Sequence, residues 1–366
     1  MKYRAAFFFT IVVGGTVLLA GCGEEPPLLP ASVRIGLSYP AAIVETQTRL
    51  REGLDFALDE INAEGGLLGK PVEFLFIDDN DNPDTAMQVA EYFADEGITA
   101  VIGHWTSDTC YYAEDIYEKA GVVMLSPGAT SSSLFQYEYN YIFRMLPGDD
   151  EFARYMAEFA AERGLRRIAI YYTNDEFGKD LSRLAERAFK RYGIPVVDRV
   201  SVLTPASAAD VFARWDAFGV DGVIAAASLD EATGPVSLIC RRYPDISVIS
   251  SESLNKLPAY EALGEAADNV FIVTYRPSAI REEFYQNYTK VFGHAPDLFA
   301  VTGYIALRLI ADAISASQSN DAGAIAAFLK NLRDYDSPVG KLSYNEASHT
   351  FEGQPIVIAG ITEQGP

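Results

Sequence analysis

The chain has 366 residues, a hydrophobic fraction of 49% and a formal net charge of -22 at pH 7. This length and apolar content allow two domains, each with a buried core. The excess of acid argues against a nucleic-acid-binding protein, because phosphates require Lys and Arg partners, and it is typical of a soluble protein whose copies repel one another.

The first 21 residues are predicted to be an export signal. Lys2 and Arg4 precede an uncharged apolar run over 5–18, which has the length of a signal sequence and is short for a membrane span. The run ends in Leu-Ala-Gly-Cys at 19–22, which resembles the bacterial lipobox and implies that Cys22 is acylated; an ordinary secretory signal is the alternative. Residues 22–31 are Pro-rich and predicted to be a tether, held at the membrane by more than one lipid chain.

Short apolar strands alternate with amphipathic helices along the rest of the chain. Helical periodicity is clear at Leu50, Leu54, Leu58 and Ile61, before the Gly-Gly pair at 65–66. The predicted strands are 33–37, 72–77, 100–102, 122–125, 168–172, 196–202, 222–226, 247–249, 270–273, 341–344 and 355–360. Nearly continuous apolar strands that alternate with helices predict α/β folding, with parallel sheets covered on both faces.

The elements form two series, so we expect two lobes, each built on a doubly wound parallel sheet. The first series ends near Pro147, and the second runs to residue 277. Three helices at 281–292, 298–317 and 321–333, followed by late strands, indicate that the chain returns and crosses again. We predict a first lobe of 32–147 and 278–334 and a second of 148–277 and 335–366, joined by a three-strand hinge. Ligands of such sheets bind at the carboxyl ends of the strands, in the cleft.

Two neighbouring strand ends carry small and hydroxyl-bearing residues. After strand 100–102, Ser107 and Asp108 are suitable helix N-caps. After strand 122–125, a Pro-Gly turn leads into Gly-Ala-Thr-Ser-Ser-Ser at 128–133. Hydroxyls and unpaired helix-start N–H groups at adjacent strand ends predict a compact site for a carboxylate. A pair of ordinary capped turns is the alternative.

Four stretches, mostly in the first lobe, match a known family. They are LDEINAEGGLLGK at 58–70, Asp-Asp at 78–79, VIGH at 101–104 and SPGAT at 126–130. Together they resemble the type I periplasmic binding proteins of ABC transporters, and most closely the leucine/isoleucine/valine-binding branch. The resemblance covers essentially the whole mature chain. It implies two lobes that close over a small ligand.

In that branch, first-lobe residues hold the amino acid's carboxylate and share in holding its ammonium. The matching positions here are Ser107 and the loop residues Gly128, Ala129 and Thr130. Trp105 is a further candidate, as the floor of the side-chain pocket; a core or rim aromatic is the alternative interpretation.

The resemblance also implies second-lobe residues, which we expect to join the site on closure. Phe177 matches a pocket aromatic, and Glu252 matches the acid that pairs with the ammonium; a solvated loop acid is the alternative for Glu252. Ser228 stands where an aromatic is expected. Asp81 and Thr106 replace two cysteines of the family, so its first-lobe disulfide is absent. Phe177 also lacks the hydroxyl of a Tyr. The changes at Ser228 and Phe177 alter the pocket wall and hence bear on which ligand is bound.

Several other signals are weak. A calcium loop starting at residue 78 would have Pro83 at its sixth position and Val89 at its twelfth, so Asn82 and Pro83 are better interpreted as a helix N-cap and first helical residue. Gly69-Lys70 lacks the upstream glycine of a phosphate loop. Ser-Leu-Asn-Lys at 253–256 has the Ser-x-x-Lys spacing of some acyl-enzymes without their companion motifs. The scattered histidines predict no zinc site. Cys110 and Cys240 are expected to be free and buried in different lobes.

The expected function is therefore capture, not catalysis, with no metal or cofactor. We expect an exported, lipid-anchored, monomeric solute-binding protein of an ABC importer. It would bind a small carboxylate, most plausibly a branched-chain or other apolar amino acid, and deliver it to a permease and its ATPase. A ligand sensor that signals to a receptor, with a different carboxylate, is the alternative; a hydrolase is less favoured, because no nucleophile–base pair is evident.

Overall fold

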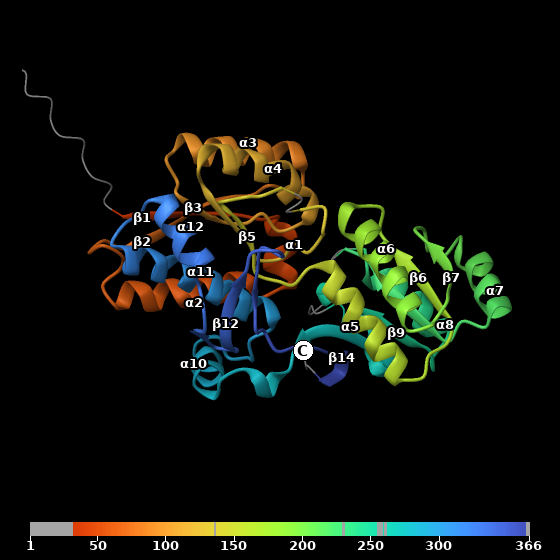
Figure 1. The fold of residues 1–366 in the computed structure, drawn as a ribbon. Coiled ribbons are helices and arrows are strands. Elements are labelled where there is room, and N and C mark those ends of the chain that lie inside the picture. The colour runs from red at the N-terminus through yellow and green to blue at the C-terminus, as the bar shows by residue number, and fades with distance from the viewer. Residues whose placement is uncertain (1–31, 135–136, 229–230, 255–258, 260–261, 364–366) are drawn as a thin grey trace, which may run out of the picture. The chain divides into compact units, whose positions relative to one another are not determined.

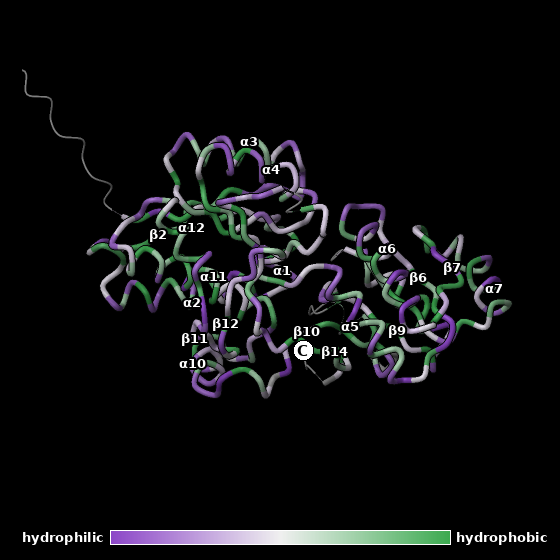
Figure 2. The backbone as a smooth tube through the Cα atoms, in the orientation of Figure 1, coloured by the Kyte–Doolittle hydropathy of each residue, from purple (hydrophilic) through white to green (hydrophobic). Residues whose placement is uncertain are grey.

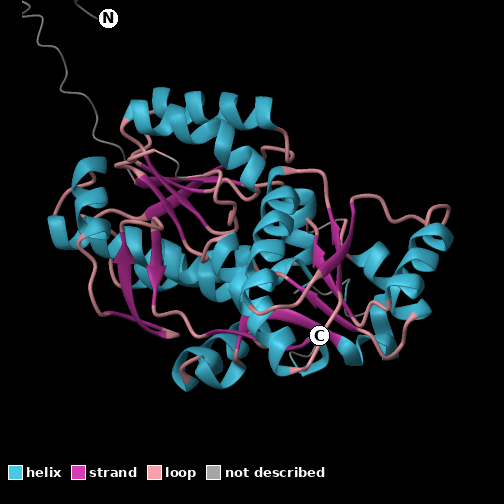
Figure 3. Cartoon of the chain, turned by 45° about the vertical axis from the view of Figure 1, so that its right-hand side comes forward, coloured by secondary structure: helices cyan, strands magenta, loops and turns pink. Residues whose placement is uncertain are grey.

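The computed structural model describes residues 32–134, 137–228, 231–254, 259 and 262–363. The predicted signal over 1–21, the tether over 22–31 and the candidate acylation site Cys22 lie outside the described residues. Two β-sheets with helices on both faces organise the described part of the chain (Figures 1 and 3). The doubly wound two-lobe fold predicted from the sequence is confirmed.

The first sheet has eight strands in the order β11-β12-β13-β5-β4-β3-β1-β2. They are β1 Val33–Ser38, β2 Val72–Ile77, β3 Ala100–Ile102, β4 Val123–Ser126, β5 Ile142–Arg144, β11 Tyr335–Ser337, β12 Gly340–Asn345 and β13 Thr350–Glu352. Strands β1 to β5 pair in parallel. Its helices are α1 Ala41–Gln47, α2 Leu50–Ala63, α3 Pro83–Asp95, α4 Ser107–Ala120, α10 Glu282–Phe292, α11 Leu298–Ser317 and α12 Ala322–Lys330.

The second sheet has six strands in the order β14-β10-β9-β8-β6-β7. They are β6 Ile168–Tyr172, β7 Val196–Val200, β8 Gly222–Ala226, β9 Ser247–Ser250, β10 Val270–Tyr275 and β14 Ile356–Gly360. All pairs are parallel except β10 with β14. The helices of this lobe are α5 Asp149–Glu162, α6 Glu176–Arg191, α7 Ala208–Phe218 and α8 Thr233–Arg242, with short 3-10 turns at Glu252–Leu254, Gly264–Asn269, Pro277–Ala279 and Ile361–Glu363.

Successive strand residues enter different cores, as a sheet covered on both faces requires. In β3, Ile102 packs into the cluster that contains α2 and α11, whereas Val101 packs into the cluster that contains α3 and α4. In β8, Ile224 and Val223 divide in the same way between two clusters. Figure 2 shows hydrophobic and hydrophilic residues interspersed along α3 and α4, as expected for helices with one buried side.

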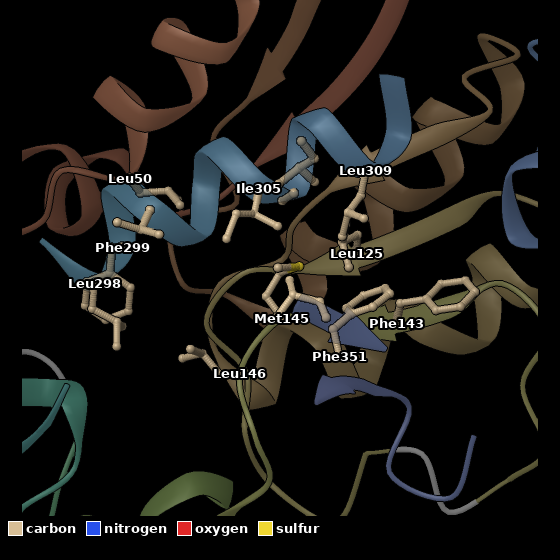
Figure 4. Close-up of a cluster of buried hydrophobic side chains, with 14 of the residues drawn as sticks. Leu50, Leu125, Phe143, Met145, Leu146, Leu298, Phe299, Ile305, Leu309 and Phe351 are labelled. Atoms are coloured by element: carbon tan, nitrogen blue, oxygen red, sulfur yellow. The ribbon is translucent and has the colours of Figure 1, made fainter. Parts of the chain in front are cut away.

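Helix α11 forms the centre of the first lobe. Among the described helices it alone is long and apolar enough to cross a membrane by composition, but 78% of that stretch is buried inside the protein. Ile305 and Leu309 face the strand residue Leu125 in the apolar cluster of Figure 4. Gly53 of α2 lets the two helices approach closely, because a Cβ there would lie 1.9 Å from the carbonyl oxygen of Ala300. This helix is therefore a core element.

The chain passes between the sheets three times, after β5, after β10 and after β13. The third passage differs from the predicted lobe boundary, which assigned 335–366 to the second lobe. Strands β11, β12 and β13 complete the first sheet, where Thr350 pairs with Arg144, and only β14 pairs in the second. The strand pattern could not reveal this, because the choice of sheet depends on which edge is open in three dimensions.

Candidate functional site

A pocket lies where the strand ends of the two sheets meet. Its cavity volume is about 100 Å³. It is lined by Asp81, Trp105, Thr106, Ser107, Asp108, Gly128, Asp175, Phe177, Ser228, Glu252, Ser253 and Phe299. The segments after β2, β3 and β4 of the first sheet and after β6, β8 and β9 of the second supply all of these except Phe299, which belongs to α11. This is the location at which doubly wound sheets bind ligands.

Six of the eight predicted ligand residues line this pocket, namely Trp105, Ser107, Gly128, Phe177, Ser228 and Glu252. Ala129 and Thr130 are buried in the loop that contains Gly128, but they lie outside the lining set. The Thr130 hydroxyl is buried and faces the carboxyl of Asp149; a hydrogen bond between them lowers the pKa of that carboxyl, although burial, the larger effect, raises it. The Thr130 carbonyl accepts hydrogen bonds from Asp149 N and Arg144 Nη1, both at 2.9 Å.

Most hydroxyls of the loop over 126–133 hold the loop itself. Ser126 Oγ donates to the carbonyl of His104 at 2.8 Å and accepts from Ala129 N at 3.1 Å. Ser107 Oγ accepts from Ser131 N at 3.2 Å, which ties the loop to the start of α4. The sequence suggested that these hydroxyls orient a ligand; the structure uses several of them to shape the wall on which a ligand would lie.

The first-lobe wall is aromatic. The ring of Trp105 packs on that of Phe299, with centroids 4.8 Å apart, and both residues are buried. Gly128 lies against the same indole, because a Cβ at Gly128 would be 3.0 Å from Trp105 Cδ2. The sequence pattern had no signal for Phe299, since it reaches the pocket from a helix almost 200 residues beyond Trp105.

The second-lobe wall is built around the start of α6. Asp175 is the N-cap of this helix, and its Oδ1 accepts from Gly178 N at 2.7 Å, as capping carboxylates do. Its other oxygen accepts a hydrogen bond from Ser228 Oγ, whose backbone N–H donates to Thr173 Oγ1 at 3.1 Å. Phe177 stands in the first turn and is half-buried beside them.

Glu252 follows β9 in a short 3-10 turn and is only 7% exposed. Its Oε2 has no hydrogen-bond partner among the described residues. Burial raises the pKa of this carboxyl from 4.5 to about 7. Hydrogen bonds from its own backbone and from the Ser251 side chain act against this shift but are smaller than the effect of burial. A buried carboxylate oxygen without a partner is costly, and such a group in a pocket indicates a place where a positively charged ligand group would be favoured.

Residues 32–366 match the family model described as periplasmic binding protein. The chain belongs to the periplasmic binding protein family. Within that family of solute-binding proteins, it is related to the branch that binds branched-chain amino acids. Leu/Ile/Val-binding protein homolog 1 of Brucella abortus (strain 2308) is 24% identical over 353 residues, which cover 94% of this chain and 92% of that protein.

Solved structures of relatives share the fold of this periplasmic binding protein. An ABC transporter substrate-binding protein from Desulfitobacterium hafniense, in complex with Leu, is 29% identical; the match covers 89% of this chain and 96% of that one, with a TM-score of 0.78. The leucine-binding protein LivK from Thermotoga maritima MSB8 is 21% identical and covers 89% of this chain and 94% of its own, with a TM-score of 0.79.

The binding protein carries a hydrogen bond where its sequence relatives are expected to have a disulfide. Thr106 Oγ1 donates to Asp81 Oδ1 at 2.8 Å, so the two positions at which the resemblance implies a disulfide are in contact. Partial burial, together with the negative charges of Asp79, Asp108 and Asp175, raises the pKa of Asp81 to about 6. Asp81 therefore contributes a carboxyl group to the pocket wall.

Other polar groups of the periplasmic binding protein serve the fold. His104 is buried and lies 2.6 Å from Asp79 and 3.2 Å from the hydroxyl of Tyr117 through its two ring nitrogens. Across the described residues, no group of three or more His, Cys, Asp or Glu is arranged to hold a metal ion. Asn82 and Pro83 begin α3 as predicted, with Asn82 Oδ1 accepting from Thr85 N at 3.0 Å.

The two cysteines outside the signal region match their prediction. Cys110 and Cys240 are free and buried, in the apolar clusters of the first and second lobe respectively. Burial raises the pKa of the Cys240 thiol to about 11 and that of Cys110 still higher, so both are protonated at neutral pH. Neither therefore has the thiolate character of a reactive cysteine.

Proposed function

We propose that this protein captures a small α-amino acid in the pocket between its lobes and delivers it to an ABC permease and its ATPase. The buried Glu252 carboxylate, with its unpartnered Oε2, carries the proposal. It is suited to the ligand's ammonium, because a charge-assisted contact replaces an unfavourable buried charge. The resemblance to Leu/Ile/Val-binding proteins and the relative solved with Leu support an amino acid with an aliphatic stem.

The first lobe offers groups for the ligand's carboxylate. Ser107 is the first residue of α4, so the positive end of that helix and its free N–H groups lie at the pocket. Trp105, Phe299 and Phe177 supply apolar surface for the stem of the side chain. Closure would then bring Glu252 and Phe177 onto a ligand already held by the first lobe.

Calorimetry with a panel of L-amino acids tests this proposal. We expect at least one to bind with micromolar affinity, and to raise the melting temperature when present well above its dissociation constant. Glu252→Gln should weaken that ligand about tenfold or more, whereas Asp210→Asn, an exposed change in α7, should not. Failure of every amino acid to bind, or equal affinity of the Glu252 variant, would reject the proposal.

We also propose that the protein is exported and attached to the membrane through a lipid on Cys22. The lipobox at 19–22 and the Pro-rich segment over 22–31 support this. Ten extended residues span at most roughly 35 Å, enough to hold the lobes beyond the lipid headgroups.

Growth of the bacterial expression host with an alkyne-tagged fatty acid tests the anchor. The unmodified protein should take up the label and partition with membranes. Cys22→Ser should take up none, and Cys110→Ser should behave as the unmodified protein. Label retained by Cys22→Ser would refute acylation at this position.

A further inference from the structure

We propose that the pocket selects an amino acid whose side chain ends in a positive charge, in addition to the α-ammonium. This inference rests on the proposed function and names the ligand class of the same site. It is carried by four carboxylates in the pocket wall, by the aromatic surfaces between them and by the unpartnered Oε2 of Glu252.

Among the described residues, the pocket wall holds acidic but no basic side chains. Asp81, Asp108, Asp175 and Glu252 all line the pocket, and no Lys, Arg or His is among the twelve lining residues. Within the described part of the chain, none of these four carboxylates has a basic nitrogen within 4.0 Å. Asp180, only five residues after Asp175, does pair with an arginine. One α-ammonium would pair with Glu252 and leave the three aspartates without a positively charged partner.

The four carboxylates come from both lobes and line the same pocket. Asp108, in α4, reaches across to the second lobe, where its Oδ2 accepts from Glu176 N at 3.2 Å. Asp108 and Asp175 contribute to the raised pKa of Asp81, and Asp108 contributes to that of Asp175, although burial is the larger cause for both. Like charges that face one another across a junction of lobes repel. A cation between them would remove this repulsion and favour closure.

The aromatic surfaces fit the same ligand. Trp105 with Phe299 on one side and Phe177 on the other supply ring surface in a wall that also holds four acidic side chains. An organic ammonium satisfies both kinds of surface, because its alkyl stem packs on the rings and its charge is attracted to ring faces and carboxylates. Glu252 points to a ligand independently of the three aspartates, since it is 7% exposed and its Oε2 has no protein partner in the described residues.

The competing explanation is that two of the aspartates only begin helices. Asp175 caps α6, and Asp108 lies in the first turn of α4. Asn is as good an N-cap as Asp, so Asp175→Asn keeps the cap and removes the charge. Asp108→Asn likewise keeps an oxygen for Glu176 N. These two variants therefore distinguish an effect of the negative charge on ligand binding from an effect of helix capping on the fold.

The test is calorimetry of the purified protein with L-lysine, L-ornithine and L-norleucine. Norleucine has the stem of lysine without the charge. We expect lysine or ornithine to bind at least tenfold more tightly than norleucine, with a difference that shrinks in 0.5 M salt. Asp175→Asn and Asp108→Asn should each weaken the basic ligand about five- to tenfold and weaken norleucine much less, and Asp210→Asn should alter neither.

The outcomes separate the two proposals. If norleucine or leucine binds as tightly as lysine and ornithine, the charge inference is overturned and amino-acid capture stands. If the aspartate variants weaken norleucine and lysine equally, these residues act through the fold, and the inference is again overturned. If no α-amino acid binds, both proposals fail together.

Discussion

The carboxylate of Asp180, in α6 of the second lobe, accepts hydrogen bonds from both the backbone N–H and the hydroxyl of Ser132, in the first lobe, at 2.7 and 2.5 Å. Ser131 Oγ donates to the same oxygen at 3.3 Å. The loop that provides Gly128 to the pocket is thus the loop that holds the second lobe. Within this one loop, Gly128 lines the pocket and Ser131 and Ser132 contact the second lobe.

Loss of the Asp180 carboxylate should weaken ligand binding. Asp180→Ala removes three contacts that join the lobes, so the closed form loses stability and the apparent dissociation constant rises, by about tenfold if roughly 1.4 kcal/mol is lost. Calorimetry measures the affinity, and small-angle scattering measures the size of the ligand-free protein, which should increase.

Arg183→Ala is the matched control for Asp180. Arg183 forms an ion pair with Asp180 but is 45% exposed in its side chain, and exposed pairs contribute little. It should bind ligand almost as the unmodified protein does. A loss equal to that of Asp180→Ala would show that the ion pair, and not the link to Ser132, supports the closed form.

The affinity for an amino acid should rise with pH between 5 and 8. The pKa of Glu252 is about 7 before binding, and the ligand's ammonium pairs with the ionised form. With one proton released on binding, affinity should fall about tenfold from pH 8 to pH 6. Titrations at several pH values check this, and Glu252→Gln should lose most of the dependence. A flat profile in the unmodified protein would contradict the assignment.

The stability of the ligand-free protein should change in the opposite direction. The pKa of Glu252 is raised from 4.5 to about 7 on folding, so its stabilising contribution is complete below pH 4.5 and is lost as the pH rises through 7. The total change is at most roughly 3 kcal/mol. Glu252→Gln, which stays neutral, should therefore unfold at higher denaturant concentration than the unmodified protein at pH 8. Equal midpoints would indicate that water or a rotamer change relieves the buried charge.

Gly128 should not tolerate a side chain. A Cβ there would lie 3.0 Å from both Cδ2 and the carbonyl oxygen of Trp105, so Gly128→Ala must displace the indole toward Phe299. We expect a loss of about 1–2 kcal/mol in the free energy of unfolding, weaker ligand binding and altered tryptophan fluorescence. Gly234→Ala is the control, because no atom lies within 4 Å of its added Cβ.

The longer strands and helices could be predicted because their hydrophobic residues follow a clear pattern along the sequence. The strands Val72–Ile77, Ile168–Tyr172 and Gly222–Ala226 and helix Leu298–Ser317 have their predicted bounds. Strands β5, β11 and β13 were missed. Each has three residues, too few for a period to show, and each includes a charged residue, whereas the equally short β3 is wholly apolar and was predicted. Because β11 and β13 were not predicted, the third passage of the chain between the lobes was placed at residue 335 and not after β13.

The candidate site was predictable only in part. Strand ends and family resemblance directed attention to Trp105, Ser107 and Glu252, which line the pocket. Phe299 and the link from Asp180 to Ser132 depend on contacts between distant segments, which no local pattern encodes. Asp108 and Asp175 were adjacent to predicted features but were interpreted as helix-start residues or passed over, since their common orientation toward one cavity appears only in three dimensions.

Strand β14 has a consequence for how the molecule is made. It pairs with β10 through five positions, from Phe271 with Gly360 to Tyr275 with Ile356. When the chain emerges from its N-terminus, after crossing the membrane in the exported protein, the six-stranded sheet would keep an unpaired edge at β10 until some eighty further residues have followed. The second sheet would therefore be completed only after the first. A chain truncated near residue 350 would expose β10 as an unpaired edge strand, which could pair with other chains and aggregate.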